Sequence, residues 1–151
     1  MKNHIKTILL LFLTLLFGLF IHPKKVYYEA TITGKVIDEA GNPIPNAIVC
    51  RMEKKIYKNK KIGSIELKYI TTDTVKTDQN GIFKLDKKSR IDWFHTPLDL
   101  PIGFCYANFE IKKNGFKTYK TKFGELKQFK KENCYACEKI KFTPIITLIK
   151  N

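Results

Sequence analysis

The four cysteines are the residues of this chain with the most distinctive chemistry. They are Cys50, Cys105, Cys134 and Cys137. An even number of cysteines in an exported domain predicts structural disulfides, and four cysteines allow three pairings. The sequence does not choose among these pairings, so all four residues are disulfide candidates.

Cys134 and Cys137 form a Cys-x-x-Cys motif, which two other chemistries use. A redox site needs a strand before the motif and a helix that opens on it, because the helix end lowers the pKa of the first thiol. Here the polar residues 130–133 precede the motif and a β-like run follows it. A zinc site needs a second pair of ligands, and Cys50 and Cys105 would supply them if folding brought all four thiolates together. Redox and metal binding at the motif are the alternatives to a structural disulfide.

Catalytic constellations are sparse in this sequence. The histidines are His4, His22 and His95, and none has a glutamate three residues later. Neither Ser64 nor Ser89 lies in a glycine-flanked nucleophile elbow. The chain also has no glycine-rich phosphate loop and no dinucleotide fingerprint. We predict that it is not an enzyme, and we assign no catalytic, cofactor-binding or metal-binding residues and no cofactor.

The chain is strongly basic. It has 28 basic and 14 acidic residues, a net charge of +14, and without the four lysines of residues 1–25 the balance is 24 to 14, or +10. A field of this size favours anionic surfaces. The lysines are spread along the chain and do not alternate with stacking aromatic residues, so we expect no nucleic-acid partner. Lys58, Lys60 and Lys61 are candidate anion contacts.

Two turn-rich stretches organise the rest of the chain. Residues 32–36 and 46–49 alternate as half-buried strands do, and residues 38–45 separate them. In this separating segment Gly41 supplies a positive φ, and Pro43 has a fixed φ and no amide donor. Asp38 is predicted to accept hydrogen bonds from backbone amides of the same turn.

The second stretch, residues 77–85, has its own turn signal. Asn80-Gly81 predicts a hairpin with a type I′ turn, which needs positive φ at both central residues. Asp78 has the same expected role as the aspartate of the first stretch. Gly115, which follows an asparagine, predicts another hairpin.

The order of these residues resembles the carboxypeptidase regulatory-like (transthyretin-like, peptidase-associated) domain family, over roughly residues 27–149. The residues that match the family's motifs, with the later Lys-x-Gly-Phe-Lys-Thr element, are Gly34, Val36, Asp38, Gly41, Pro43, Ile44, Ala47, Val49, Thr77, Asp78, Gly81, Phe83, Lys113, Gly115, Phe116, Lys117 and Thr118. We assign to the turns of the fold motif Gly34, Asp38, Gly41, Pro43, Asp78, Asn80, Gly81 and Gly115. The resemblance implies an all-β, transthyretin/prealbumin-like antiparallel sandwich of about seven strands. It says little about activity, because such folds host many functions.

Three further segments carry specific expectations. The lysine-rich residues 53–66 are predicted to form a long exposed hairpin or loop, where binding often differs within one fold. Residues 90–104 contain prolines and many apolar side chains, which predicts a loop that packs across one end of the sandwich, with an exposed aromatic patch as the alternative. Residues 140–149 close the sheet, and Pro144 indicates an edge or a bulge.

The N-terminal residues 1–25 resemble a secretory signal. Lys2 and Lys6 precede an uncharged run over residues 7–21, but no small-x-small cleavage site follows it. We therefore expect an uncleaved signal-anchor, a single-pass helix near the minimum spanning length, that holds residues 26–151 on the periplasmic side of a bacterial inner membrane. A cleaved, secreted β-sandwich is the alternative.

These observations predict a non-catalytic, membrane-tethered envelope domain for binding or scaffolding. The expected partner is an envelope protein or an anionic polymer, contacted through exposed sheet edges or residues 53–66, for example by strand addition. The competing function is a thiol redox or metal-binding protein that uses Cys134 and Cys137.

Overall fold

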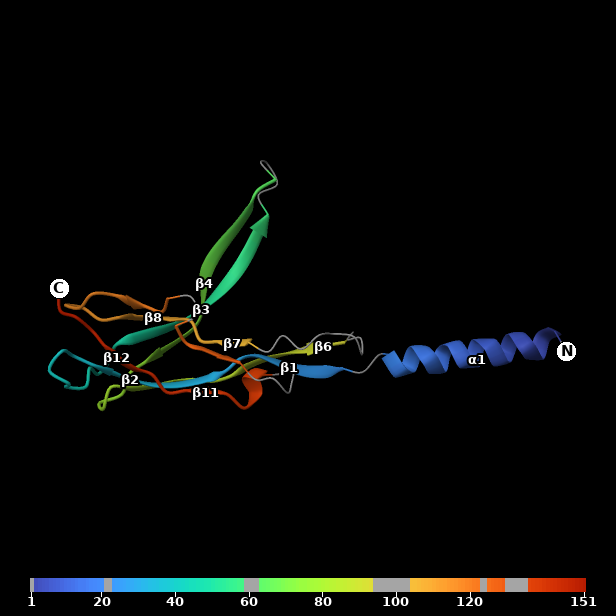
Figure 1. The fold of residues 1–151 in the computed structure, drawn as a ribbon, viewed down its shortest axis with the longest axis horizontal. Helices are drawn as coiled ribbons and strands as arrows, with labels where there is room; N and C mark the ends of the chain where they lie inside the picture. Colours follow the sequence, from blue (N-terminus) through green and yellow to red (C-terminus); the bar gives the residue numbers. More distant parts are fainter. Residues whose placement is uncertain (1, 21–22, 59–62, 94–103, 123–124, 130–135) are drawn as a thin grey trace.

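The computed structural model describes residues 2–20, 23–58, 63–93, 104–122, 125–129 and 136–151. One helix precedes a body made almost entirely of strands (Figure 1). The elements, in chain order, are α1 (Lys2–Phe20), β1 (Lys24–Glu29), β2 (Thr31–Ile37), β3 (Ile48–Lys58), β4 (Ile65–Lys76), β5 (Ile82–Leu85), β6 (Lys88–Asp92), β7 (Phe104–Tyr106), β8 (Phe109–Lys112), β9 (Tyr119–Lys120), β10 (Lys127–Phe129), the 3₁₀ helix η1 (Ala136–Glu138), β11 (Lys141–Phe142) and β12 (Ile145–Thr147).

Strand β2 is the centre of the first of two larger sheets. β5 pairs with one edge of β2 in the antiparallel direction, and β11 and β12 pair one after the other with its other edge in the parallel direction. Pro144 separates these two short strands, and its carbonyl oxygen accepts a hydrogen bond from the Lys35 amide at 2.9 Å. The expected break at Pro144 is therefore present, but the sheet is mixed and not purely antiparallel.

The second larger sheet is antiparallel, with the strand order β4-β3-β8-β9. The two sheets pack face to face, and the rings of Phe83 in β5 and Phe109 in β8 meet with centroids 5.6 Å apart. The buried cluster draws on both sheets and on the segments beside them: Ala30, Ile32, Val36, Ile44, Ala47, Val49, Phe83, Leu85, Cys105, Ala107, Phe109, Ile111, Cys137, Ile140, Phe142, Ile146 and Leu148. The β-sandwich is confirmed, but the described part of the chain contains twelve strands and not about seven.

Two short ribbons, β1–β6 and β7–β10, extend the body toward α1 (Figure 1). β6 pairs with β1 through Lys24 opposite Asp92, so the start of the predicted apolar loop is a strand instead. Ile91 and Trp93 at the end of this strand are 59% and 57% exposed, so they do not plug the sandwich. The rest of that predicted loop, residues 94–103, lies outside the described residues.

The predicted hairpin at Asn80-Gly81 is a corner between the two sheets. β4 pairs with β3 and β5 pairs with β2, so the turn joins strands of different layers. Gly81 has φ +73°, but Asn80 does not have a positive φ, because Asn46 is the only described non-glycine residue that does. The type I′ prediction for Asn80-Gly81 was therefore wrong, since that turn needs both central residues in the left-handed region.

The turns that begin at Asp38 and Asp78 share one geometry. In each, the aspartate Oδ1 accepts hydrogen bonds from the backbone N–H groups two and four residues later, at 2.8–2.9 Å. The glycine three residues later, Gly41 or Gly81, donates its N–H to the aspartate carbonyl at 3.0 Å. The aspartate side chains thus satisfy the turn amides, as the sequence predicted.

The other residues assigned to motif turns have varied positions. Gly34 lies within strand β2, where a Cβ atom would come within 2.4 Å of the Phe83 ring, so its role is close packing and not a turn. Pro43 forms an isolated bridge with Ile37. Gly115, with φ +83°, lies in the turn between β8 and β9.

Helix α1 extends away from the sheets (Figure 1). Its described apolar side chains are exposed; for example, Ile8 is 66% and Leu15 is 69% exposed. Among the described residues, no helix is both long and apolar enough to cross a membrane.

Candidate functional site

A two-stranded arm projects from the sandwich, and we define it as residues 53–58 and 63–70 (Figure 1). Its strands pair from Glu53 opposite Ile70 to Lys58 opposite Ile65. β8 pairs with β3 only as far as Arg51, so beyond this point β3 pairs only with β4 in the described part of the chain. The predicted exposed hairpin over residues 53–66 is thus the outer part of a longer hairpin.

A β-bulge lies where the arm leaves the body. Arg51 pairs with Asp73 and Met52 with Thr71, so Thr72 has no residue opposite it. A bulge bends the strand and increases its twist, which directs the arm away from the sheet. The Met52 amide makes a last hydrogen bond to the Asn108 carbonyl at 2.9 Å.

The arm has two faces, because successive side chains along each strand point to opposite sides of the ribbon. We call one of them the outer face. Its positions are Lys54, Ile56 and Lys58 on β3 and Tyr69, Leu67 and Ile65 opposite them. The three aliphatic side chains are between 52% and 67% exposed. Lys120 from β9 lies over the Tyr69 ring, with Nζ 5.0 Å from the ring centroid. This face therefore combines exposed apolar side chains with basic groups and has no acidic position.

The inner face of the arm continues the core-facing side of β3. Its positions are Glu53, Lys55 and Tyr57, with Ile70, Lys68 and Glu66 opposite them. Lys68 pairs with Glu66 at 2.9 Å, and its Nζ lies 5.8 Å from the centroid of the Tyr57 ring. The hydrogen bond to Glu66 raises the pKa of Lys68. This face of the arm therefore carries residues of both signs, with Lys68 and Glu66 paired.

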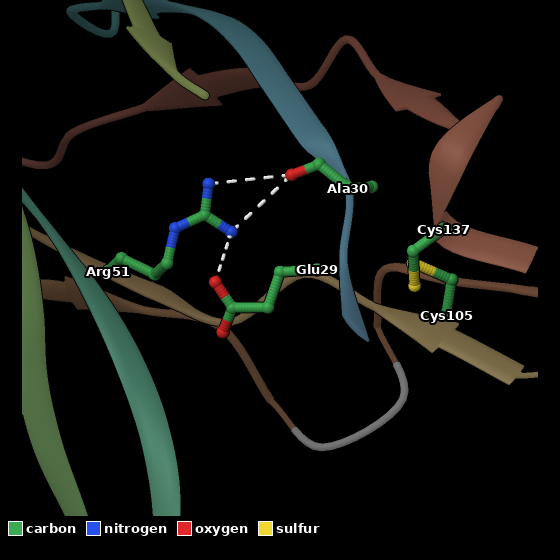
Figure 2. Close-up of a disulfide and its surroundings, with 5 residues drawn as sticks. All are labelled: Glu29, Ala30, Arg51, Cys105 and Cys137. Atoms are coloured by element: carbon green, nitrogen blue, oxygen red, sulfur yellow. Dashed lines mark hydrogen bonds and ion pairs between the residues drawn. A yellow bond between two sulfur atoms is a disulfide. The ribbon is translucent and has the colours of Figure 1, made fainter. Parts of the chain in front are cut away.

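A buried arginine fixes the base of the arm (Figure 2). Arg51 is only 1% exposed, and its Nη1 lies 2.6 Å from Glu29 Oε2, while its Nε lies 3.3 Å from Asp73 Oδ2. Its Nη2 donates to the Asp86 carbonyl at 2.7 Å, and both Nη atoms lie 3.4 Å from the Ala30 carbonyl. The guanidinium thus joins β3 to the places where β1 meets β2 and β5 meets β6.

Lys88 extends this cluster to the first residue of the arm. Its Nζ lies 3.1 Å from Glu53 and 3.2 Å from Asp73. The cluster therefore holds three carboxylates and two cations. Burial raises the pKa of Glu29, and the neighbouring Arg51 opposes this effect. Because the carboxylates already have cationic partners, we assign the cluster a positioning role at the base of the arm.

One disulfide between the candidate cysteines is present in the described part of the chain, and with Cys50 free none of the three complete pairings is shown. Cys105 and Cys137 form a buried disulfide between β7 and η1, with Cα atoms 5.3 Å apart (Figure 2). This spacing is within the usual range for disulfides. Cys50 is a buried free thiol beside Thr74, whose Oγ1 lies 3.7 Å from its sulfur. Cys134 lies outside the described residues.

The disulfide bears on the alternative chemistries of the Cys-x-x-Cys motif, because one of the two motif cysteines is bonded outside the motif. The sulfur of Cys137 is bonded to Cys105, so it forms neither a redox pair with Cys134 nor a thiolate ligand. The four-thiolate zinc site fails for the same reason, because two of its expected ligands are bonded to each other. In the described part of the chain, no three histidine, cysteine or acidic residues are grouped as a metal site.

Of the candidate anion contacts, only Lys58 is described. It is exposed at the end of β3, while Lys60 and Lys61 lie outside the described residues. Sequence reasoning missed Arg51 and Lys88, the cations of the buried cluster. A signal was present, because Arg51 lies two residues after Val49 and so continues the inward alternation of that strand.

Comparisons with known proteins assign neither a family nor a function. No family model and no curated protein sequence matches the chain. Among solved structures, 3-chlorocatechol 1,2-dioxygenase from Rhodococcus opacus 1CP is similar at 15% identity and a TM-score of 0.44, over 87% of this chain and 61% of that one. A group B streptococcus pilus 2b backbone protein is similar at 12% identity and a TM-score of 0.38, over 82% of this chain and 42% of that one. The chain spans less than two thirds of either protein, and neither likeness carries an argument about activity.

Proposed function

We propose that this chain is a non-catalytic binding or scaffolding domain that captures a partner protein through the arm. The observation that carries the proposal is the exposed apolar outer face of the arm. None of its side chains belongs to the buried cluster of the sandwich. The body therefore has no packing use for them, and clustered apolar side chains that project from a domain are typical of interaction sites.

Strand addition is the mode of binding that fits this geometry. In the described residues, the arm is two strands wide, and its strands pair only with each other. Both outer edges of such a ribbon present backbone donors and acceptors to an incoming strand. A hairpin of two strands is only marginally stable in water, so a third strand would stabilise the arm as well as bind to it.

On this proposal the sandwich is a carboxypeptidase regulatory-like, transthyretin-like domain. The contacts of the motif residues support this assignment. Thr77, one of the matching residues, is buried; its Oγ1 donates to the Ile44 carbonyl at 2.7 Å and accepts from the Ala47 amide at 2.8 Å. It thereby ties together the two turn-rich stretches that carry the resemblance.

The proposed place of work is the envelope, on the outer side of a bacterial inner membrane. The buried disulfide supports an oxidising compartment, since disulfides are rare in the cytosol. Residues 1–25 direct export and are either kept at the membrane or removed by cleavage. Intact mass measured on separated membrane and soluble fractions distinguishes these two outcomes, and alkylation before and after reduction reports the state of the thiols. Full-length protein with four free thiols would contradict export.

Site-specific photocrosslinking in cells tests the binding function. A photoreactive amino acid replaces Leu67 on the arm or, as the control, Ile145 on β12, which is 69% exposed. We expect a discrete adduct of higher mass from position 67 and none from position 145. If positions 56, 65 and 67 all fail to give an adduct, or if position 145 gives the same one, the arm is not the binding site.

A further inference from the structure

We propose that the end of the β1–β6 ribbon docks on the surface of a bilayer that contains anionic phospholipids. We call this end the ribbon tip and define it as residues 23–27 and 87–93. The inference rests on the part of the proposed function that keeps residues 1–25 at a membrane, whether α1 crosses the bilayer or lies in its surface. It adds a second contact between the chain and the lipid, and it does not involve the arm.

The chain places the ribbon tip beside the end of α1 (Figure 1). α1 ends at Phe20 and β1 begins at Lys24. Four residues of chain span at most roughly 14 Å, so the first residue of β1 lies within about that distance of the helix end. The polar layer on each side of the hydrocarbon is about 5–8 Å thick. With α1 held in lipid, the ribbon tip is therefore confined to the polar layer or to the water just outside it.

Two large apolar side chains are exposed at the ribbon tip. Ile91 is 59% exposed and Trp93 is 57% exposed. Trp93 directly follows Asp92, which pairs with Lys24, so the tryptophan belongs to the end of the ribbon that is nearest to α1. Tryptophan is enriched at membrane interfaces, because its ring is apolar while its N–H can still reach water or headgroups. At this position the bilayer surface would cover both side chains.

One face of the ribbon tip combines these apolar groups with basic ones. Lys25 pairs with Ile91, so their side chains lie on the same face of the ribbon. The next pair on this face is Tyr27 with Ser89. The Nζ atoms of Lys25 and Lys87 lie 5.4 and 4.3 Å from the centroid of the Tyr27 ring. A ring does not neutralise a lysine, so both charges can attract anionic headgroups.

An open hollow of about 550 Å³ lies on this face, lined by Pro23, Lys25, Ser89, Arg90 and Ile91. Among the described residues that line it, none is acidic. Asp92 is paired with Arg90, whose Nε lies 2.9 Å from its carboxylate. The hollow therefore offers basic and apolar groups side by side, which suits the phosphate and the upper acyl chain of a phospholipid.

A lipid surface fits the ribbon tip better than a second copy of the chain. If two tips met through this face, Lys25 and Lys87 of one copy would repel those of the other. The tip is also joined to α1, whose exposed apolar side chains need a lipid or protein cover of their own. One bilayer can cover the helix and the tip together.

Tryptophan fluorescence of the full-length protein tests the proposal. Trp93 is the only tryptophan of the chain, so the emission reports on the ribbon tip alone. The protein is reconstituted into vesicles of phosphatidylcholine, with or without phosphatidylglycerol, and flotation measures its retention. Lipids brominated at shallow or deep positions of the acyl chain report the depth of the ring, and acrylamide reports its access to water.

In the anionic vesicles we expect emission at shorter wavelength, and stronger quenching by the shallow bromines than by the deep ones. The control variant combines Trp93→Phe with Leu67→Trp, which moves the tryptophan to the arm. Its emission should be quenched freely by acrylamide and not by the brominated lipids. Equal quenching of both proteins by brominated lipid would mean that the whole body contacts the bilayer, and the proposal would be wrong.

A charge reversal on the protein sharpens the test. Lys25→Glu with Lys87→Glu should lower the ratio of docked to undocked tip by about tenfold or more, because two attractions to the anionic surface become repulsions. The matched control, Lys35→Glu with Lys141→Glu, changes the net charge by the same amount at exposed positions of β2 and β11 and should leave docking unchanged. If both double variants lose docking equally, net charge alone decides it and the ribbon tip is not the docking surface.

Three other results would overturn the inference. The first is a Trp93 ring as accessible to acrylamide as the tryptophan on the arm while the protein floats with the vesicles, and this result leaves membrane retention intact. The second is equal docking with and without phosphatidylglycerol. The third is an emission shift that follows protein concentration without quenching by brominated lipid, which would place a second copy on the tip. Absence of flotation would contradict membrane retention as well, whereas capture by the arm is judged separately by photocrosslinking.

Discussion

The two ends of β3 belong to one continuous strand but lie in opposite surroundings. Residues 49–52 are all buried, whereas residues 54–58 are all exposed. At the base, β3 has β4 and β8 on its two sides and the first sheet above it, and Arg51 is held by contacts from several segments. On the arm, in the described residues, the strand has only β4 beside it. The base is thus specified by contacts with several segments of the body, whereas the arm depends mainly on the pairing of its own two strands.

This difference separates two kinds of measurement. Substitutions at the base should change the free energy of unfolding, because they remove contacts that join distant strands. Substitutions on the arm should leave stability nearly unchanged and alter binding. Each prediction below tests this separation.

The largest effect is expected at Arg51. Arg51→Ala should lower the free energy of unfolding by about 3–5 kcal/mol, because it leaves Glu29 buried without its cation. Lys68→Ala on the arm removes an exposed ion pair and should cost no more than about 1 kcal/mol. Urea unfolding followed by circular dichroism measures both. Equal costs would show that base and arm are not distinct.

Loss of the disulfide should rank next. Cys105→Ala with Cys137→Ala opens a link between residues separated by 32 positions, and the chain-entropy model gives a loss of about 3–4 kcal/mol. Reduction should shift the melting temperature of the native protein but not that of the double variant. Because the link lies in the body, crosslinking through position 67 should persist wherever the variant is folded. Stability unaffected by either treatment would argue against the pairing.

Two glycines with positive φ give a smaller contrast between body and arm. At Gly81 a Cβ atom would lie 2.3 Å from the Val36 carbonyl oxygen, whereas at Gly63 it would have no atom within 4 Å. Gly63→Ala should cost only the strain of a left-handed residue, about 1–2 kcal/mol at most. Gly81→Ala adds a backbone clash and should lower the melting temperature further. The reverse order would contradict the placement of these turns.

On the arm itself we expect almost no effect on stability. Leu67→Lys replaces a side chain that is 52% exposed, so the free energy of unfolding should change by less than about 0.5 kcal/mol. The same change should weaken capture of the partner, because it adds charge to the apolar outer face. Urea unfolding and crosslinking from position 56 measure the two effects. A large loss of stability would mean that the arm packs on the body.

The smallest expected effect depends on pH and lies in the body. The Asp38 carboxylate accepts hydrogen bonds from the side chain and the backbone N–H of Asn42 and from the backbone N–H of Ala40. These hydrogen bonds lower the pKa of Asp38. A lowered folded-state pKa contributes stability above the unfolded value, and this contribution is lost as the pH falls through the folded one. Asp38→Asn should therefore flatten the decline of the melting temperature below about pH 4. An unchanged acid profile would mean that Asp38 contributes nothing measurable there.

The local features of this protein could be predicted from single segments. The aspartate turns follow from residue types at fixed spacing, because each aspartate bonds amides of its own turn. The exposed hairpin over residues 53–66 follows from its lysines and its lack of buried alternation. Asn80-Gly81 shows the limit of this reasoning. The turn was recognised from its residues, but the two strands that it connects do not pair with each other: β4 pairs with β3, and β5 pairs with β2.

What the sequence determined by itself was thus the class of fold, the places where the chain turns and the stretch that stays outside the core. These depend on side-chain period and on hydrogen bonds within a few residues. Only the tertiary structure decided which cysteines pair, which strands become neighbours and why Arg51 is buried. Those outcomes depend on groups far apart in the chain, such as Glu29, Arg51 and Asp86, whose contacts exist only after the sheets have packed together.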